Sequence, residues 1–306
     1  MNSTNLRNSI LLTIDVEDWF QVENFKHCIP SSSWPSYDLR VEKNTHRILD
    51  LLDSNNGPPT TDDGHSEMPR ATFFVLGWIA ERLPHLIREI HARGHEVASH
   101  GYYHDLCNQQ SPDALKKDLA DSKKLLEDII GVPVYGYRAP SFSVNADILK
   151  IIEACGYLYD SSFNSFAIHD RYGQMDLSNH RKKGIAAKIL DSFYELPISN
   201  LKLGNHIFPW GGGGYFRLTP FPLFKMGVQS ILKNQKVFLF YLHPWEIDPE
   251  QPKVRETSVS YKLRHYVNLS RNYSKLSNFV RSFNQCHFVT CYNYLQELGI
   301  ENQVEN

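Results

Sequence analysis

Short apolar runs alternate with longer segments of helical periodicity along most of the chain. The apolar runs are rich in β-branched and aromatic residues, which predicts buried strands at 9–15, 70–76, 95–100, 193–196, 236–242 and 286–290. Between them, apolar residues recur every three or four positions at 83–90, 112–130 and 146–152, and each of these segments ends close to a glycine. This order of elements is typical of an α/β protein with a largely parallel sheet.

Two segments depart from this rhythm. Residues 55–70 are polar, rich in proline and glycine, and without periodicity, so we expect a surface loop there. Four consecutive glycines at 211–214 indicate a place where the backbone bends or comes close to a ligand. Neither segment resembles a linker between domains, so we expect one main domain.

The composition narrows the possible functions. A formal net charge of −2 in 306 residues argues against a basic face for nucleic acid, so we expect no nucleic-acid partner. Five cysteines at irregular spacings, without a CxxC pair, suit a reducing compartment and indicate a cytoplasmic protein. The apolar run 10–14 stops at Asp15 and is too short for a transmembrane segment.

Polar side chains that could bind a metal follow two of the predicted strands. Asp15 and Glu17 end the first strand, and strand alternation puts them on one face, although acids in a strand-end turn are often merely solvated. His100 and His104 would share a face on a helical turn and could both reach one cation. An HxxxH pair alone is a weak signal. Two imidazoles and one carboxylate with open positions, however, are typical of catalytic zinc.

Three more polar groups follow later strands. Arg138 comes just before Pro140, Asp160 follows a short strand-like stretch, and His243 ends the strongest strand in the chain. Each of these alone would more often be a structural residue or part of a surface turn. Five polar constellations at successive strand ends, however, indicate the mouth of a barrel active site.

In their order and spacing, these motifs resemble those of the polysaccharide deacetylases, that is, carbohydrate esterase family 4 with the NodB-homology domain. The motifs are Thr13 to Glu17, His100-x-x-x-His104, Arg138-Ala139-Pro140, Tyr159 to Ser162 and Leu242-His243-Pro244. The resemblance covers residues 10–248 and implies a distorted (β/α)7 barrel of the α/β class, with 249–306 as a C-terminal extension packed on it. DVEDWF, GGGYFR and the HPWEID tail are similar to the branch associated with exopolysaccharide and exosortase gene clusters.

The resemblance also implies residue roles. Asp15 matches the general base, His243 the general acid, and Arg138 the residue that holds the base. Asp160 matches the acid that orients the histidine, and the backbone N–H of Ser141 matches an oxyanion donor.

A divalent metal, with Zn²⁺ preferred, would be held by Glu17, His100 and His104. The family's adjacent Asp-Asp is replaced here by Asp15-Val16-Glu17-Asp18, so Asp18 is the alternative third ligand. We prefer Glu17 because the strand period places it beside Asp15.

The function implied is metal-dependent removal of N-acetyl groups from a glycan or a lipid-linked amino sugar, in exopolysaccharide biosynthesis. Trp19, Tyr215 and Trp245 could stack on sugar rings, although aromatic residues of this kind are more often part of a core. Two other hypotheses remain, namely an amide hydrolase similar to allantoinases or deformylases, and a catalytically inactive carbohydrate-binding protein. The sequence does not predict an oligomeric state.

Overall fold

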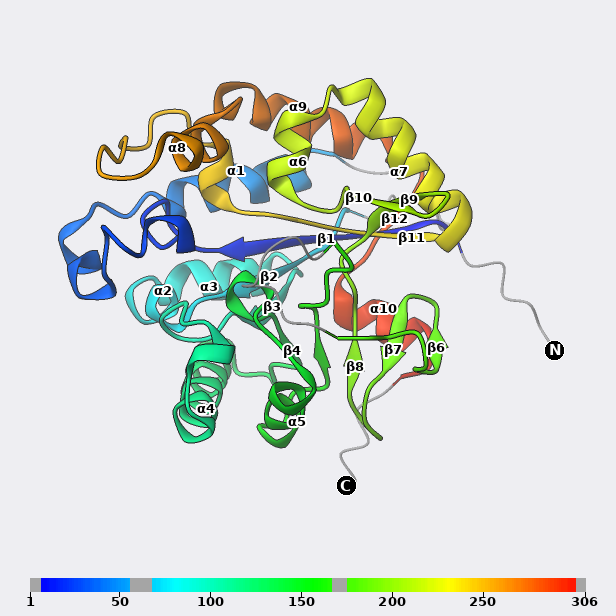
Figure 1. Cartoon of the computed structure of the whole chain (residues 1–306), viewed down its shortest axis with the longest axis horizontal. Coiled ribbons are helices and arrows are strands. Elements are labelled where there is room, and N and C mark those ends of the chain that lie inside the picture. Colours follow the sequence, from blue (N-terminus) through cyan, green and yellow to red (C-terminus); the bar gives the residue numbers. More distant parts are fainter. Residues whose placement is uncertain (1–6, 56–67, 167–174, 301–306) are drawn as a thin grey trace.

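A curled sheet dominates the computed structural model, which describes residues 7–55, 68–166 and 175–300 (Figure 1). The strand order is β11-β1-β2-β3-β4-β5-β8-β7-β6, with β12 paired to β1. Neighbouring strands from β11 to β8 are parallel, whereas β7 and β6 are antiparallel. The strands are β1 Ser9–Val16, β2 Ala71–Val75, β3 Glu96–Ser99, β4 Gly136–Tyr137, β5 Tyr159–Asp160, β6 Lys182–Lys183, β7 Ala186–Lys188, β8 Tyr194–Glu195, β11 Val237–Leu242 and β12 His287–Phe288, with a separate hairpin of β9 Asn200–Leu203 and β10 His206–Pro209.

Helices connect successive parallel strands, as the alternating sequence pattern predicts. They are α1 Val41–Asp53, α2 Gly77–Arg82, α3 Pro84–Ala92, α4 Pro112–Ile130, α5 Ala146–Ala154, α6 Gly213–Leu218, α7 Phe221–Gln235, α8 Val259–Tyr266, α9 Leu269–Ser282 and α10 Cys291–Glu297. The Ser111 hydroxyl caps α4 and the Asn145 amide oxygen caps α5. Gly131 ends α4 with a φ of 76°, a left-handed conformation that glycine adopts without strain.

The two faces of the sheet bury two separate hydrophobic clusters, because strand side chains alternate. Ile10, Leu12 and Ile14 pack in the outer cluster, under helices that include α1, α3, α7 and α9. The side chain of Leu11 points to the opposite face of the sheet, which we call the inner face. It packs there in the second cluster, with residues that include Leu295 of α10. Thr13 and Asp15 share the parity of Leu11, so the same alternation that builds the core directs Asp15 to the inner face.

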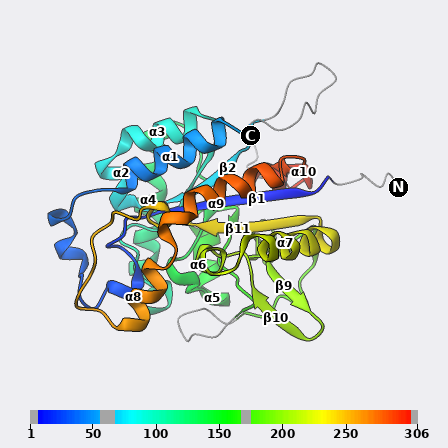
Figure 2. The ribbon, with the colours of Figure 1, turned by 90° about the horizontal axis from the view of Figure 1, so that it is seen from above.

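The chain after residue 248 extends the main fold. It contains α8 and α9, and the strand predicted at 286–290 contains β12, which pairs with Ser9 and Ile10 of β1. In the view from above, α9 crosses over β1 and β11 (Figure 2).

The predicted barrel-like α/β class is confirmed. The loop predicted at 55–70 falls mostly on residues outside the described ranges, and no helix within those ranges is long and apolar enough to cross a membrane.

Candidate active site

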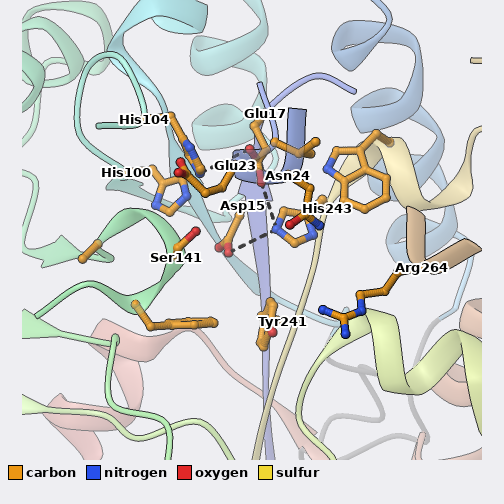
Figure 3. A pocket seen from close by; sticks show the side chains of 14 residues that line it. Asp15, Glu17, Glu23, Asn24, His100, His104, Ser141, Tyr241, His243 and Arg264 are labelled. Atoms are coloured by element: carbon orange, nitrogen blue, oxygen red, sulfur yellow. Dashed lines mark ion pairs between the residues drawn. The ribbon is translucent and has the colours of Figure 1, made fainter. Parts of the chain in front are cut away.

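A cavity of about 200 Å³ opens where the parallel strands end (Figure 3). Its lining includes seven of the residues predicted from the sequence, which are Asp15, Glu17, His100, His104, Ser141, His243 and Trp245. They come from β1, from the segments after β3 and β4, and from the end of β11. Parallel pairing brings these strand ends to one edge of the sheet, so residues far apart in the sequence share one cavity.

Glu17, His100 and His104 form a group that could hold a metal ion. One ligand atom from each lies within 4.8 Å of the others, and all three side chains are buried. The Nδ1 atom of His100 lies 2.7 Å from the carbonyl oxygen of Arg138, which leaves Nε2 to face the cavity. The Oε2 atom of Glu17 is buried without a hydrogen-bond partner among the described residues. It lies 3.4 Å from His104 Nε2, and a buried carboxylate oxygen that accepts no hydrogen bond beside two imidazoles fits a divalent cation.

The charge states of these three residues also suit a cation. Burial raises the pKa of Glu17, but the nearby His104, His243 and His100 outweigh it and lower that pKa to about 2. Burial lowers the pKa of His104 to about 4 against the opposing effect of Glu17, and it lowers the pKa of His100 as well. At neutral pH the group therefore offers two neutral imidazoles and one carboxylate, the forms that bind metal.

The two histidines meet on a turn and not on a helix, which corrects the predicted geometry. Gly101 has a φ of 75° and His104 a φ of 58°, so the chain turns tightly between the two ligands. The Asp118 carboxylate accepts a hydrogen bond from the backbone N–H of Tyr102 at 3.1 Å, which holds this turn against α4. The imidazole ring centroids are 5.3 Å apart.

Arg138 holds Asp15 in a fully buried network. Its Nη1 donates to Asp15 Oδ1 and to Thr13 Oγ1, each at 2.7 Å. Its Nε donates to the Ser161 carbonyl and its Nη2 to the Ser161 hydroxyl, each at 2.9 Å. The guanidinium also lies over the Phe74 ring, 4.1 Å from its centroid. The guanidinium that donates to Asp15 is thus itself fixed from several sides.

Asp18 faces away from the metal group. Its Oδ2 accepts from the backbone N–H groups of Arg40 and Val41 at 2.6 and 2.8 Å, and its Oδ1 accepts from that of Trp19 at 2.8 Å. It therefore fixes the start of α1. Burial raises the pKa of this carboxyl to about 6 against the lowering effect of these amide donors. This geometry favours Glu17 over Asp18 as the third ligand.

We expect Asp18→Ala to lower the free energy of unfolding by about 1 kcal/mol, the usual cost of losing a helix cap, and to leave the metal content unchanged. Glu17→Ala should remove the metal. Urea unfolding and elemental analysis of the purified variants measure both effects. Metal loss from Asp18→Ala with retention in Glu17→Ala would reverse the ligand assignment.

His243 is oriented by Glu246, which the sequence analysis did not single out. The Nδ1 of His243 lies 2.7 Å from Glu246 Oε1, and its Nε2 lies 2.9 Å from Glu17 Oε1 and 3.8 Å from Asp15 Oδ2. Glu246 in turn accepts from Arg217 Nε at 2.8 Å. Burial lowers the pKa of His243, but the Glu17 and Glu246 carboxylates outweigh it and raise that pKa to about 10.

Asp160 does not have the position predicted for it. Its carboxylate accepts from the hydroxyl of Ser162 at 2.8 Å and from the backbone N–H of Ser162 at 3.0 Å. It is also hydrogen-bonded to Glu195 of β8, a second missed acid. Burial and the Asp160 charge raise the pKa of Glu195 well above its ordinary value, so the pair holds a proton. Asp160 therefore stabilises the loop that contacts the Arg138 guanidinium. The carboxylate that contacts His243 is Glu246.

The three predicted sugar-stacking residues lie in different environments. Trp19 is 3% exposed, packs against Phe20 and Tyr37 with centroids 5.4 and 5.3 Å away, and is absent from the cavity lining, which indicates a packing role. Tyr215 on α6 is 40% exposed. Trp245 lines the cavity and stacks on His243 with centroids 5.1 Å apart.

The far face of Trp245 stacks on His265 of α8, with centroids 4.2 Å apart. The His265 ring is buried, and its Nε2 lies 2.6 Å from the Gln251 side-chain oxygen. Burial and then the Arg217 charge lower the pKa of His265 to about 3, far below its ordinary value of 6.5. The folded state therefore binds this proton less readily than the unfolded chain. The resulting stabilisation is complete above pH 6.5 and is lost as the pH falls toward 3.

Between about pH 6 and 4, we therefore expect His265→Gln to reduce the loss of stability on acidification, by up to about 1.4 kcal/mol per pH unit. Glutamine keeps a donor for Gln251 but binds no proton in this range. Urea unfolding at several pH values gives the slope for each protein. Identical slopes for the wild type and the variant would show that His265 is not a proton-linked group of the fold.

Two protein-family models match successive parts of this chain. The polysaccharide deacetylase model matches residues 65–159, and a domain of unknown function (DUF3473) matches residues 161–296. The two matches meet at the end of β5. His100, His104 and Arg138 lie in the first match, and Arg217, His243 and Glu246 lie in the second.

Curated relatives give the same assignment. A peptidoglycan deacetylase-like protein of Gibberella zeae is 29% identical over 162 residues, which is 52% of this chain and 44% of the relative. A peptidoglycan-N-acetylglucosamine deacetylase of Bacillus cereus is 31% identical over 113 residues, or 37% and 47% of the two chains. This chain thus spans about half the length of these relatives.

The fold is also similar to that of solved structures. A putative polysaccharide deacetylase from Mycobacterium smegmatis superposes with a TM-score of 0.62 at 19% identity, over 98% of this chain and 93% of the other. At that identity the likeness concerns the fold alone. On the ordered motifs and the family matches, residues 65–159 form part of a polysaccharide deacetylase domain of the NodB type, and residues 161–296 are of the DUF3473 type.

Proposed function

We propose that this protein is a metal-dependent hydrolase that removes the N-acetyl group from an amino sugar in a glycan or a lipid-linked precursor. The observation that carries the proposal is the convergence of Asp15, His243 and the Glu17–His100–His104 group on one cavity. Deacetylase activity on N-acetylated sugars is named for the relatives. The branch-specific sequence motifs support a role in exopolysaccharide biosynthesis.

Glu17, His100 and His104 would hold the cation, for which Zn²⁺ suits a set of two imidazoles and one carboxylate. When bound, a divalent ion would polarise the acetyl carbonyl and lower the pKa of the attacking water. The backbone carbonyl of Arg138 fixes the tautomer of His100, because the carbonyl oxygen can only accept a hydrogen bond, which requires the proton to be on Nδ1. The ligand set is thus prepared by the same residue that holds Asp15.

Asp15 would act as the general base. Only one of its oxygens is taken up by Arg138, and the second, Oδ2, faces His243 across the cavity. That oxygen is available to accept a proton from water at the strand end. Thr13 and Ser161 hold the guanidinium in place, so Asp15 keeps its orientation when a proton arrives.

His243 would act as the general acid that protonates the departing sugar amine. Glu246 accepts a hydrogen bond from Nδ1–H and favours the charged imidazolium, and Nε2 lies toward the cavity, 2.9 Å from Glu17 Oε1 and 3.8 Å from Asp15 Oδ2. Amines leave poorly without protonation, so this group is needed for an amide more than for an ester. Trp245 stacks beside the imidazole and restricts its rotation.

The backbone at Ser141 is suited to stabilise the oxyanion. Ser141 lines the cavity and has a φ of 51°, a left-handed conformation that is uncommon for a residue with a side chain. Pro140 precedes it in a short 3-10 helix, Pro140–Phe142, which limits its movement. We assign its N–H group to the tetrahedral intermediate.

Acetate release tests the proposal. The purified protein, stripped with a chelator and reloaded with zinc, cobalt or manganese, is incubated with N-acetylglucosamine oligosaccharides and, in parallel, with cyclic and acyclic ureides and formamides. We expect metal-dependent acetate release from the sugars, with His100→Ala inactive and free of metal. Turnover of the ureides or formamides alone would favour a small-amide hydrolase, and absence of any turnover in the metal-loaded protein would contradict the proposal.

A further inference from the structure

The charges around the cavity are divided between its two sides. Asp15, Glu17 and Glu23 lie on the side of the metal group, and Arg264 lies on the other side, with its guanidinium directed toward Tyr241 (Figure 3). Among the described residues that line the cavity, Arg264 is the only arginine or lysine. A substrate held at the metal group would therefore meet a single positive charge at the opposite edge.

The backbone of Arg264 is fixed although its side chain is exposed. Arg264 lies near the end of α8, and its carbonyl oxygen accepts a hydrogen bond from Arg217 Nη2 at 3.1 Å. Arg217 is itself buried and paired with Glu246, so α8 is tied to the residues that orient His243. Within the described ranges, no carboxylate forms an ion pair with the Arg264 guanidinium. The backbone at this edge is thus held in position, and those residues leave the charge of the side chain uncompensated.

Tyr215 provides an apolar surface near this charge. Tyr215 lies on α6 two residues before Arg217, whose guanidinium contacts the Arg264 carbonyl oxygen at 3.1 Å, so both residues lie at the contact between α6 and α8. The Arg264 charge accordingly opposes the rise that burial causes in the pKa of Tyr215. The Tyr215 ring is 40% exposed, and its buried side meets Phe166 in an edge contact with centroids 6.1 Å apart. A sugar ring can stack on an exposed tyrosine, and a guanidinium binds carboxylate or phosphate oxygens in pairs.

We propose that Arg264 and Tyr215 form a subsite for a negatively charged unit next to the acetamido sugar. The substrate would then be an acidic glycan or a phosphate-linked amino sugar, in preference to a neutral homopolymer. This inference rests on the proposed function, because it takes the acetamido group to lie at the metal group. Carboxylate and phosphate share the chemistry that Arg264 recognises, and the experiment distinguishes them.

Binding is measured by calorimetry on the zinc-loaded Asp15→Asn protein, which keeps the ligand intact. The probes are a neutral N-acetylglucosamine tetrasaccharide, a tetrasaccharide of alternating N-acetylglucosamine and glucuronic acid, and a diphosphate ester of N-acetylglucosamine. In the Asp15→Asn protein, the additional substitution Arg264→Ala should weaken the binding of one anionic probe about tenfold, since a hydrogen bond to a charged group contributes at least about 1.5 kcal/mol. The neutral probe should change less than about twofold. Arg264→Lys should recover part of the loss.

The control is Arg271→Ala, which removes the same charge from an exposed site on α9 outside the cavity lining. Sensitivity of the glucuronic acid probe alone identifies a carboxylate, and sensitivity of the diphosphate alone identifies a phosphate. Equal weakening of the neutral probe, an equal effect of Arg271→Ala, or failure of both anionic probes to bind would overturn the subsite. Acetate release by the wild type is assayed separately, so a failure of the proposed function is seen independently of Arg264.

Discussion

Asp15→Asn should retain stoichiometric metal and lose on the order of a hundredfold or more in kcat, the usual contribution of a general base. The asparagine side-chain oxygen can still accept the hydrogen bond from Arg138 Nη1, so the geometry of the network is kept. What is lost is the second carboxylate oxygen as a proton acceptor. Steady-state acetate release and elemental analysis of the same preparation measure rate and metal together.

Asp18→Asn is the matched control, because it makes the same chemical change three residues away in a carboxylate directed at backbone amides. It should leave kcat within a few fold of the wild type. Arg138 is fully buried, so the Asp15→Asn protein will be less stable, and urea unfolding must confirm that it is folded in the assay. Near-normal turnover by metal-loaded Asp15→Asn would show that the water needs no base at this position.

Glu246→Gln should reduce kcat on N-acetyl sugars about a hundredfold and spare substrates with a good leaving group. Glutamine keeps the shape and can still accept from Arg217, but it no longer stabilises a positive charge on His243. Protonation of the leaving amine should then become limiting. On 4-nitrophenyl acetate, whose leaving group needs no proton, the variant should stay within about fivefold of the wild type.

The control for Glu246 is Glu250→Gln, a change at a side chain that is 73% exposed and follows the 3-10 helix η5, Pro244–Ile247. It should behave as the wild type on both substrates. An equal loss on the amide and the ester in Glu246→Gln would point to a general disturbance of the site. That outcome would remove Glu246 from the mechanism and leave it a structural role in anchoring α6.

Most of the architecture could be predicted from the sequence because local patterns determine it. The run 236–242 is apolar at every position but the first, as a strand covered on both faces requires, and it forms β11. Ser111 and Asn145 mark helix starts by capping chemistry alone. The hairpin β9–β10 was not predicted, because β9 alternates polar and apolar residues over only four positions and β10 does not alternate.

The site was predicted where its residues end strands and missed where they depend on long-range packing. Glu246 stands three residues after His243, and their contact requires the 3-10 turn that begins at Pro244, a spacing that could have been considered. Its pairing with Arg217, 29 residues earlier, has no local signal. Trp19 follows β1, which ends at Val16, and of the two roles that the sequence left open for it, sugar stacking and core packing, its contacts indicate packing.

The pairing of β1 with β11 has a consequence for the chain as a polymer. β11 covers one edge of β1 along six consecutive residue pairs, although β11 lies far along the chain in the second family match. A fragment that stopped near residue 160 would expose the edge of an eight-residue, largely apolar strand, the kind of surface on which identical chains add to one another. During synthesis this edge of β1 therefore stays open until about eighty further residues have emerged. A pause in translation, or a truncation before β11, would therefore favour aggregation over folding.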